Sequence, residues 1–94
     1  MRKGTIAKNI IKALAKANGI TAEVSDFYSA KAWKDRCENY GTNSELVIVH
    51  EGELQYLFDP CVCPGLFDKL QSELNKVGLF AEACTGWYSA IYEN

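Results

Sequence analysis

The strongest structural constraint in this chain of 94 residues is the run Leu46-Val47-Ile48-Val49. Four consecutive apolar residues, three of them β-branched, indicate a strand that is covered on both faces. Turn-forming residues at 42–44 precede the run, and a glycine follows it at position 52. We therefore expect residues 46–49 to form the central strand of a sheet.

A second apolar run, at residues 54–58, follows the turn at 50–53. Gly52 can adopt the positive φ that a tight hairpin turn requires. The spacing therefore predicts that residues 54–58 pair with 46–49 as a β-hairpin.

Three other segments repeat apolar residues at spacings of three and four, which is typical of helices that bury one face. These predicted helices cover residues 6–17, 27–40 and 66–77. In the second one, the spacing places Trp33 and Cys37 in the core under the sheet.

Residues 20–24 indicate a short first strand, and residues 79–84 and 87–92 indicate a closing hairpin. The predicted fold class is α+β, with a mainly antiparallel sheet and helices on one face. Its centre is a ferredoxin-like split βαβ core, to which an N-terminal helix and a C-terminal strand are added. We expect residues 1–94 to form a single domain, because a chain of this length builds one core.

The hydropathy pattern allows a prediction of the cellular location of the protein. No apolar run approaches the roughly 20 residues that span a bilayer, so we expect no membrane segment. The basic N-terminus leads into an amphipathic segment and not into the apolar stretch of a secretory signal. We therefore expect a cytoplasmic protein whose four cysteines, Cys37, Cys61, Cys63 and Cys84, remain reduced.

The charges are unevenly distributed along the chain. The first seventeen residues carry five basic side chains and no acidic one, and the remainder carries five basic against twelve acidic residues. Lys8, Lys12 and Lys16 recur every four residues on the polar side of the first predicted helix. This stripe is either a solubilising surface or a surface for phosphates or an acidic partner, and it predicts weak, non-specific nucleic-acid binding.

From about Trp33 onward the chain resembles small accessory proteins encoded by bacteriophages and prophages. Three segments carry the resemblance: Cys37-Glu38-Asn39-Tyr40-Gly41, Glu45-Leu46-Val47-Ile48-Val49-His50-Glu51-Gly52 and Cys84-Thr85-Gly86-Trp87-Tyr88-Ser89-Ala90-Ile91-Tyr92. Proteins of this kind often bind and inhibit host machinery, including restriction and CRISPR defence complexes. The resemblance implies this setting in a bacterial host, and it implies no catalytic residue.

Cysteine and histidine residues leave a metal site open as an alternative. His50, Cys61 and Cys63 supply thiolate and imidazole groups that suit zinc, with Cys37 or Cys84 as a further ligand. The lone Cys-x-Cys lacks the paired Cys-x-x-Cys spacing of most zinc sites, and a glycine stands where a zinc deaminase has its glutamate. We therefore expect small buried thiols, a solvated His50 beside the turn, no cofactor and no enzymatic activity.

The aromatic residues are too many for one small core to enclose. Alternation in the final strand places Tyr88 and Tyr92 on one face and Trp87 and Ile91 on the other. We predict that Tyr88 and Tyr92 are exposed, are flanked by Tyr56 and form the partner-binding surface, unless a homodimer or the extra strand covers them.

The predicted function is that of a small binding protein that occupies a host protein or nucleoprotein complex, such as a CRISPR or restriction complex. The first alternative is a nucleic-acid-binding module that uses the basic first helix. The second alternative is a zinc-binding domain or a small enzyme.

Overall fold

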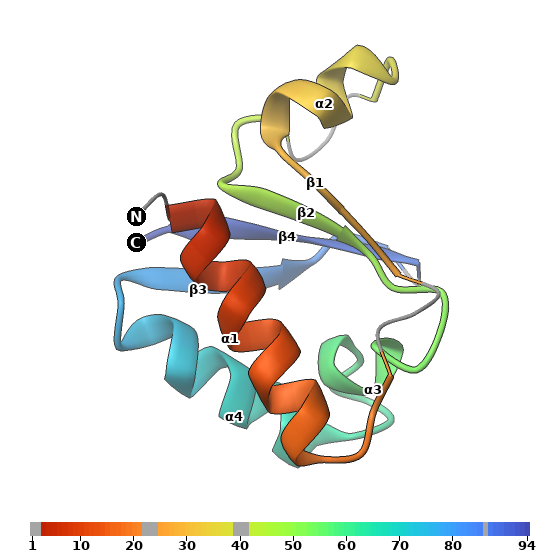
Figure 1. Ribbon diagram of the computed structural model, residues 1–94, viewed down its shortest axis with the longest axis vertical. Coiled ribbons are helices and arrows are strands. Elements are labelled where there is room, and N and C mark those ends of the chain that lie inside the picture. The colour runs from red at the N-terminus through yellow and green to blue at the C-terminus, as the bar shows by residue number, and fades with distance from the viewer. Residues whose placement is uncertain (1–2, 22–24, 39–41, 86) are drawn as a thin grey trace.

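The computed structural model describes residues 3–21, 25–38, 42–85 and 87–94. Its helices and strands follow one another in the order shown in Figure 1. They are α1 (Lys3–Ala17), β1 (Asp26–Tyr28), α2 (Ala30–Asp35), β2 (Leu46–Val49), α3 (Gln55–Phe58), α4 (Pro64–Asn75), β3 (Leu79–Ala83) and β4 (Tyr88–Glu93).

The strands form one antiparallel sheet in the order β1-β2-β4-β3. All four residues of β2 are buried, which confirms that the run 46–49 is central and covered on both faces. Ile48 lies opposite Phe27 of β1 and Ser89 of β4, and Ala81 of β3 lies opposite Ile91 of β4. The α+β class and the antiparallel sheet are therefore confirmed.

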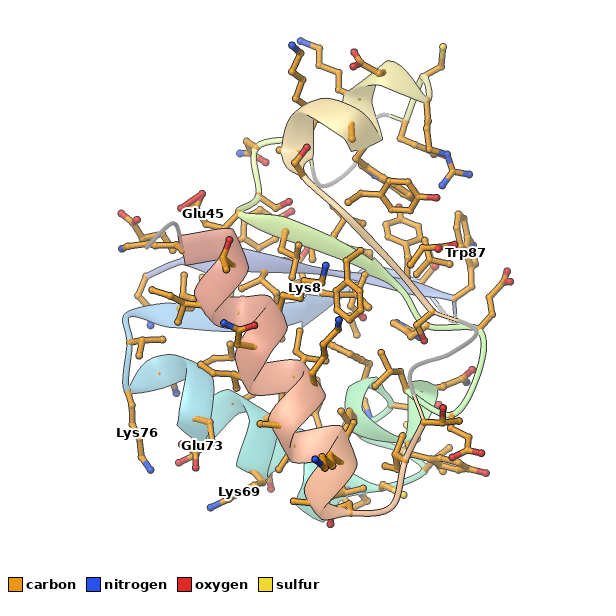
Figure 2. All side chains as sticks on the ribbon, viewed as in Figure 1. Lys8, Glu45, Lys69, Glu73, Lys76 and Trp87 are labelled. Carbon is orange, nitrogen blue, oxygen red and sulfur yellow. The ribbon has the colours of Figure 1, made fainter. Side chains whose placement is uncertain are left out.

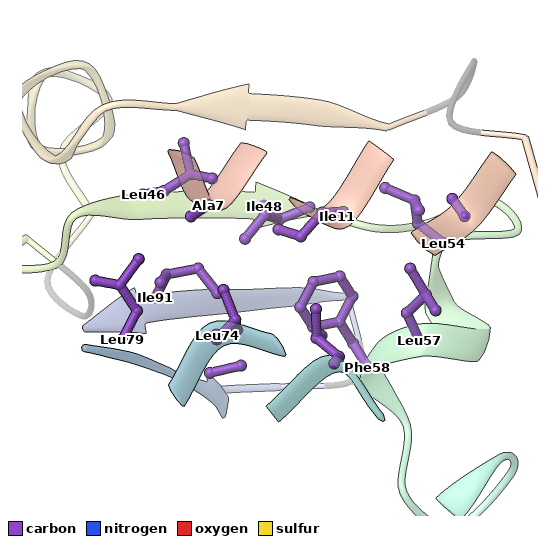
Figure 3. Close-up of a cluster of buried hydrophobic side chains, with 13 residues drawn as sticks. Ala7, Ile11, Leu46, Ile48, Leu54, Leu57, Phe58, Leu74, Leu79 and Ile91 are labelled. Carbon is purple, nitrogen blue, oxygen red and sulfur yellow. The ribbon is translucent and has the colours of Figure 1, made fainter. Parts of the chain in front are cut away.

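One face of the sheet lies under α1, α3 and α4, and we call it the helix-covered face (Figures 1 and 3). Leu46 and Ile48 of β2, Ile91 of β4 and Ala81 of β3 meet the apolar sides of these helices there. The helix α1 begins very close to the sheet: a Cβ atom at Gly4 would lie 2.6 Å from the Glu45 carbonyl oxygen. Only glycine fits at that position without a shift of the backbone.

The other face carries α2, so the prediction that all helices share one face is wrong. Trp33 of α2 is fully buried and packs with Val47 and Val49 of β2 and with Tyr88 and Ala90 of β4. These side chains alternate with those of the helix-covered face along each strand. The predicted burial of Trp33 is confirmed.

The predicted strand at residues 54–58 is wrong, because these residues form α3. Leu54, Leu57 and Phe58 are almost fully buried, and their spacing of three and four places them on one side of a helix. No edge of β2 is left for a hairpin partner, because β1 and β4 occupy both of its sides. The ferredoxin-like split βαβ core, which needs a strand at this place, is not confirmed.

The second predicted helix begins too early and ends too late. Asp26–Tyr28 is strand β1, paired with β2, and the helix begins after Ser29, whose Oγ accepts a hydrogen bond from the Ala32 N–H at 3.1 Å. The helix ends before Cys37, which adopts the left-handed φ of 66° and is exposed, so Cys37 is not a core residue. Of the strand predicted at 20–24, residues 20 and 21 are not in a strand and the others lie outside the described residues, as does the predicted helix end at Tyr40.

The first helix, the third helix and the closing hairpin are confirmed as α1, α4 and the pair β3 and β4. Each depends on a strong local pattern, and Gly78, with φ of 79°, lies in the turn between α4 and β3. Within the described part of the chain, none of the helices is long and apolar enough to cross a membrane.

Candidate partner-binding site

The face of the sheet opposite the three helices carries a continuous group of aromatic side chains, which we call the aromatic face. It includes Val47, Val49 and Ala90 as its floor, and the rings of Tyr28, Trp33, Phe80, Trp87, Tyr88 and Tyr92. The register explains this grouping, because Tyr28 lies opposite Val47, and Phe80 lies opposite Tyr92. The short helix α2 packs on β1 and β2, and its Trp33 side chain also contacts Tyr88 and Ala90 of β4.

Trp33 is the centre of the ring contacts. Its ring centroid lies 5.0 Å from that of Tyr88, 5.4 Å from that of Tyr28 and 6.1 Å from that of Trp87, in tilted arrangements. The guanidinium of Arg36, just after α2, lies 5.0 Å from the rings of both Tyr28 and Trp33. Such cation–π contacts hold a flexible cation in a defined place at the border of the cluster.

Trp87 extends this cluster to the surface. Its side chain is 39% exposed, and its ring contacts Tyr88 edge to face at 4.6 Å. Its backbone is fixed on both sides: the Thr85 Oγ1 accepts a hydrogen bond from the Trp87 N–H at 3.3 Å, and the Trp87 carbonyl accepts one from the His50 N–H at 2.9 Å. In Figure 2 Trp87 stands at the margin of the sheet, away from the charged residues labelled on α4.

The predicted exposed pair, Tyr88 and Tyr92, is only partly found. Alternation places both tyrosines on the aromatic face and Ile91 on the helix-covered face, as expected. Tyr88 is buried at 5% exposure, because Trp33 and Trp87 cover its ring, so its predicted exposure is wrong. Tyr92 is half-buried beside Phe80, with ring centroids 5.7 Å apart.

Tyr56 does not flank the tyrosines of β4. It is 47% exposed, as a partner-binding residue would have to be, but it lies on α3 and not on a neighbouring strand. The helix α3 covers the opposite face of the sheet, where Leu57 and Phe58 are part of the aliphatic core. The structure therefore separates Tyr56 from the aromatic face.

Two ionisable groups on the aromatic face resist taking a negative charge. Burial raises the pKa of the Cys84 thiol, and the nearby Glu82 carboxylate raises it further. Burial also raises the pKa of the Tyr92 hydroxyl, with Cys84 and Glu82 acting in the same direction. Both groups are half-buried, and the Cys84 Sγ lies 3.9 Å from the carboxylate of the exposed Glu82.

His50 is not the solvated turn residue that we expected. It is 2% exposed, its Nε2 lies 2.8 Å from the Ser89 Oγ, and its ring stacks on Phe58 at 4.9 Å. Burial lowers the pKa of His50 below its ordinary value of 6.5. The Nδ1 atom is buried and has no hydrogen-bond partner among the described residues.

The cysteines do not share one environment. Cys37 and Cys61 are exposed and Cys63 and Cys84 are half-buried, so the expectation of buried thiols is wrong. Across the residues that the structure describes, no group of three or more histidine, cysteine or acidic side chains could hold a metal ion. His50, Cys61 and Cys63 are thus not assembled into the alternative zinc site. A catalytic cysteine would be hydrogen-bonded to a histidine that accepts its proton, and no described cysteine is hydrogen-bonded to His50.

The lysine stripe of α1 lies beside the edge of the sheet. The Nζ atoms of Lys8 and Lys12 are 5.2 and 5.6 Å from the ring centroid of Phe27 in β1. Lys8 is half-buried, and Lys12 and Lys16 are exposed. Lys8 also lines a groove of about 520 Å³ between α1 and the sheet, which we call the α1–β1 groove. Its lining consists of Lys3, Gly4, Thr5, Lys8, Phe27, Ser29, Glu45 and Leu46.

Sequence reasoning missed two residues of the candidate site. It assigned no role to Arg36, and it placed Trp87 on the face opposite Tyr88. Trp87 precedes β4, so strand alternation does not apply to its side chain. Thr85 and Gly86 in the sequence are compatible with a strand that begins at Trp87, so the sequence carries no signal for the later start at Tyr88.

Comparisons with known proteins found no matching family model, no similar curated protein and no similar solved structure. The function is therefore argued from the surfaces described above.

Proposed function

We propose that this protein is a binding protein that captures another protein through its aromatic face. The observation that carries the proposal is the exposure of Trp87, whose ring is continuous with the buried cluster of Trp33 and Tyr88. Tryptophan, tyrosine and arginine are the residue types that contribute most to binding energy at protein interfaces. Trp87, Tyr28 and Arg36 each contact the buried ring of Trp33.

The site is arranged for binding before a partner arrives. Hydrogen bonds to Thr85 and from His50 hold the backbone of Trp87, and the rings of Trp33 and Tyr88 support its side chain. Arg36 is held over two rings. Side chains that are already ordered lose little conformational entropy on association, which favours affinity.

The charges on the aromatic face favour a protein partner over nucleic acid. Glu82 and Asp26 are exposed there, opposite Ala90 and Val49 respectively. The raised pKa values of Cys84 and Tyr92 also indicate surroundings that disfavour negative charge. A phosphate backbone would be repelled at this face, whereas an apolar protein surface with a carboxylate near Arg36 would be complementary.

The resemblance to phage accessory proteins supports a more specific setting. In this proposal the partner is a component of a bacterial defence complex, such as a CRISPR or restriction complex, in the host cytoplasm. The protein acts by occupying the component and performs no chemistry. A second copy of this chain is the competing occupant of the aromatic face, because exposed apolar patches commonly self-associate.

The proposal is tested by comparing baits that differ at one exposed aromatic residue. Wild-type protein, Trp87→Ala and Tyr56→Ala are immobilised and exposed to bacterial lysate, with and without nuclease. Tyr56→Ala is the matched control, because Tyr56 is an aromatic residue that is also exposed, at 47% against 39% for Trp87, on the opposite side of the sheet. The captured protein is then purified and titrated against each variant.

We expect a protein that is retained by wild type and Tyr56→Ala after nuclease treatment, with an affinity at least about tenfold lower for Trp87→Ala, as for a hot-spot residue. Equal affinity for Trp87→Ala would contradict the proposal. Capture that disappears with nuclease would favour the nucleic-acid alternative. A dimer that dissociates on the Trp87→Ala substitution would assign the aromatic face to self-association.

A further inference from the structure

The two edges of the sheet differ in how their backbone groups are protected. The outer edge of β3 is closed by a side chain: the Gln71 amide donates to the Ala81 carbonyl at 2.7 Å and accepts from the Ala81 N–H at 2.8 Å. The Asn94 side chain also donates to the Leu79 carbonyl at 3.3 Å. These hydrogen bonds take the place of those that a neighbouring strand would form, so they hinder the addition of another strand at β3.

The other edge, β1, has no such closure in the residues that the structure describes. It pairs with β2 only, and no described strand lies on its outer side. The α1–β1 groove runs beside it, between Lys8 of the helix and Phe27 of the strand, with Glu45 nearer to the start of α1 (Figure 2). An open strand edge beside a groove is the arrangement in which extended peptides bind by adding a strand.

Two positive charges at this edge are unpaired, and they lie near the acidic residues Asp26 of β1 and Glu45 of the groove. The ammonium groups of Lys8 and Lys12 converge on one ring, that of Phe27, and neither forms an ion pair with a carboxylate in the described part of the chain. Lys3 is different, because it is paired with Glu93 at 2.6 Å. Since α1 contains no acidic residue, an anionic ligand would meet Lys8 and Lys12 without a competing carboxylate on the helix.

We propose that the β1 edge and the α1–β1 groove bind an extended acidic segment of another polypeptide, which adds to β1 as a further strand. Lys8 and Lys12 are separated by about 6 Å along the helix axis. Alternate residues of a strand, whose side chains point to the same face, are separated by about 6.6 Å. The preferred segment therefore carries acidic residues at two alternate positions, with a basic or polar residue toward Glu45.

A peptide fits this edge better than a nucleic acid. Only a polypeptide supplies the alternating N–H and C=O groups that a strand edge binds. The lysines cover Phe27, the aromatic residue of the groove, so its ring is not free for base stacking. Glu45 would also repel a phosphate chain that followed the groove.

The test uses a fluorescein-labelled hexapeptide with glutamate at two alternate positions and valine between and around them, titrated by fluorescence anisotropy. A second peptide carries N-methyl groups on the valine amides, which keeps the charges and prevents strand pairing. Two double variants of the protein are compared. One combines Lys8→Ala with Lys12→Ala, and the charge-matched control combines Lys16→Ala with Lys34→Ala, which removes two exposed lysines that do not line the groove. Circular dichroism checks that each variant is folded.

We expect the Lys8 and Lys12 double variant to bind about tenfold more weakly and the control double variant to bind within about twofold of wild type. The N-methylated peptide should bind at least about tenfold more weakly, and the unmodified peptide should shift the NMR amide signals of Asp26, Phe27 and Tyr28. Equal binding of the N-methylated peptide, or equal losses in the two double variants, would overturn the proposal. Stronger binding of a single-stranded oligonucleotide would assign the lysines to phosphate instead.

This inference is independent of the aromatic face. Trp87→Ala should leave peptide affinity unchanged, because Trp87 does not line the α1–β1 groove. A loss of capture with Trp87→Ala and a loss of peptide binding with the lysine variant can therefore be told apart.

Discussion

The two faces of the sheet bury their apolar side chains in different ways. The helix-covered face is enclosed by α1, α3 and α4, and its buried side chains are almost all aliphatic (Figure 3). The aromatic face is covered by one short helix, and its rings largely cover one another. Aliphatic side chains need a complete cover, whereas tyrosine and tryptophan tolerate partial contact with water. The helix-covered face therefore encloses the aliphatic core, and the aromatic face is suited both to stability and to binding.

The largest expected effect is that of Trp33→Ala. Trp33 is fully buried and contacts three other rings, so its removal should lower the free energy of unfolding by about 3–5 kcal/mol. This loss would equal that of Phe58→Ala on the helix-covered face, where about 3–5 kcal/mol is also expected. Urea denaturation of both variants tests the comparison. A loss below about 1 kcal/mol for Trp33→Ala would mean that the aromatic face is not a second core.

The two tyrosines of β4 should differ in their contribution to stability. We expect Tyr88→Ala to cost about 2–4 kcal/mol, because the ring is buried under Trp33. Tyr92→Ala should cost about 1 kcal/mol, because its ring is half-exposed beside Phe80. Thermal and urea unfolding of the single variants measure the difference. Equal costs would show that the aromatic face is covered evenly and has no exposed part on β3 and β4.

Acidification should lower the free energy of unfolding, because His50 is buried on the helix-covered face of the sheet. Burial places the pKa of the folded-state imidazole below the value of 6.5 expected for the unfolded chain. Below pH 6.5 the imidazole is therefore protonated in the unfolded chain while it is still neutral in the folded protein. The free energy of unfolding consequently falls as the pH decreases toward the folded-state pKa. At higher pH both states are neutral and the effect disappears.

The measurement is the urea midpoint at about pH 7.5 and about pH 5.5, for wild type and for His50→Gln, which does not titrate in this range. The decrease on acidification should be smaller in His50→Gln. Identical decreases in the two proteins would assign the pH dependence to other groups.

The smallest expected effect concerns the difference in reactivity between the exposed thiols and a half-buried one. Cys37 and Cys61 are exposed, whereas Cys84 lies half-buried on the aromatic face with a raised pKa. Because the thiolate is the reactive form, Cys84 should react with a thiol-specific reagent more slowly than the two exposed cysteines. Mass spectrometry of peptides after brief labelling measures the order. Modification of Cys84 before Cys61 would indicate that the aromatic face opens readily to solvent.

The elements that were predicted correctly are those with strong local patterns. The periodicity of apolar residues specifies α1 and α4, and the uninterrupted run specifies β2 as the central strand. The segment at residues 54–58 was predicted wrongly, because a run of five residues fits a strand or one turn of helix equally well. Because β2 pairs with β1 and β4, it leaves no free edge for residues 54–58, which form a helix instead of a strand.

The candidate site was predicted only in outline. The excess of aromatic residues indicated an exposed aromatic surface, and alternation placed Tyr88 and Tyr92 on the same face. Which of these rings is exposed depends on where Trp33 lies, and the contact between α2 and β4 is not encoded in local spacing. The burial of His50 likewise depends on Phe58 and Ser89, which are distant in sequence.

Local patterns along the chain are enough to specify the α+β class, the central strand, the two longer helices and the assignment of side chains to opposite faces of β4. These properties follow from local hydropathy and from backbone geometry, which repeat over a few residues. Contacts between segments that are distant in sequence set the strand order, the helical state of α3, the exposure of Trp87 instead of Tyr88, and the convergence of Lys8 and Lys12 on Phe27. Burial and charge pairing depend on which segments meet in space, and alternation along a strand cannot specify which of its faces another element will cover.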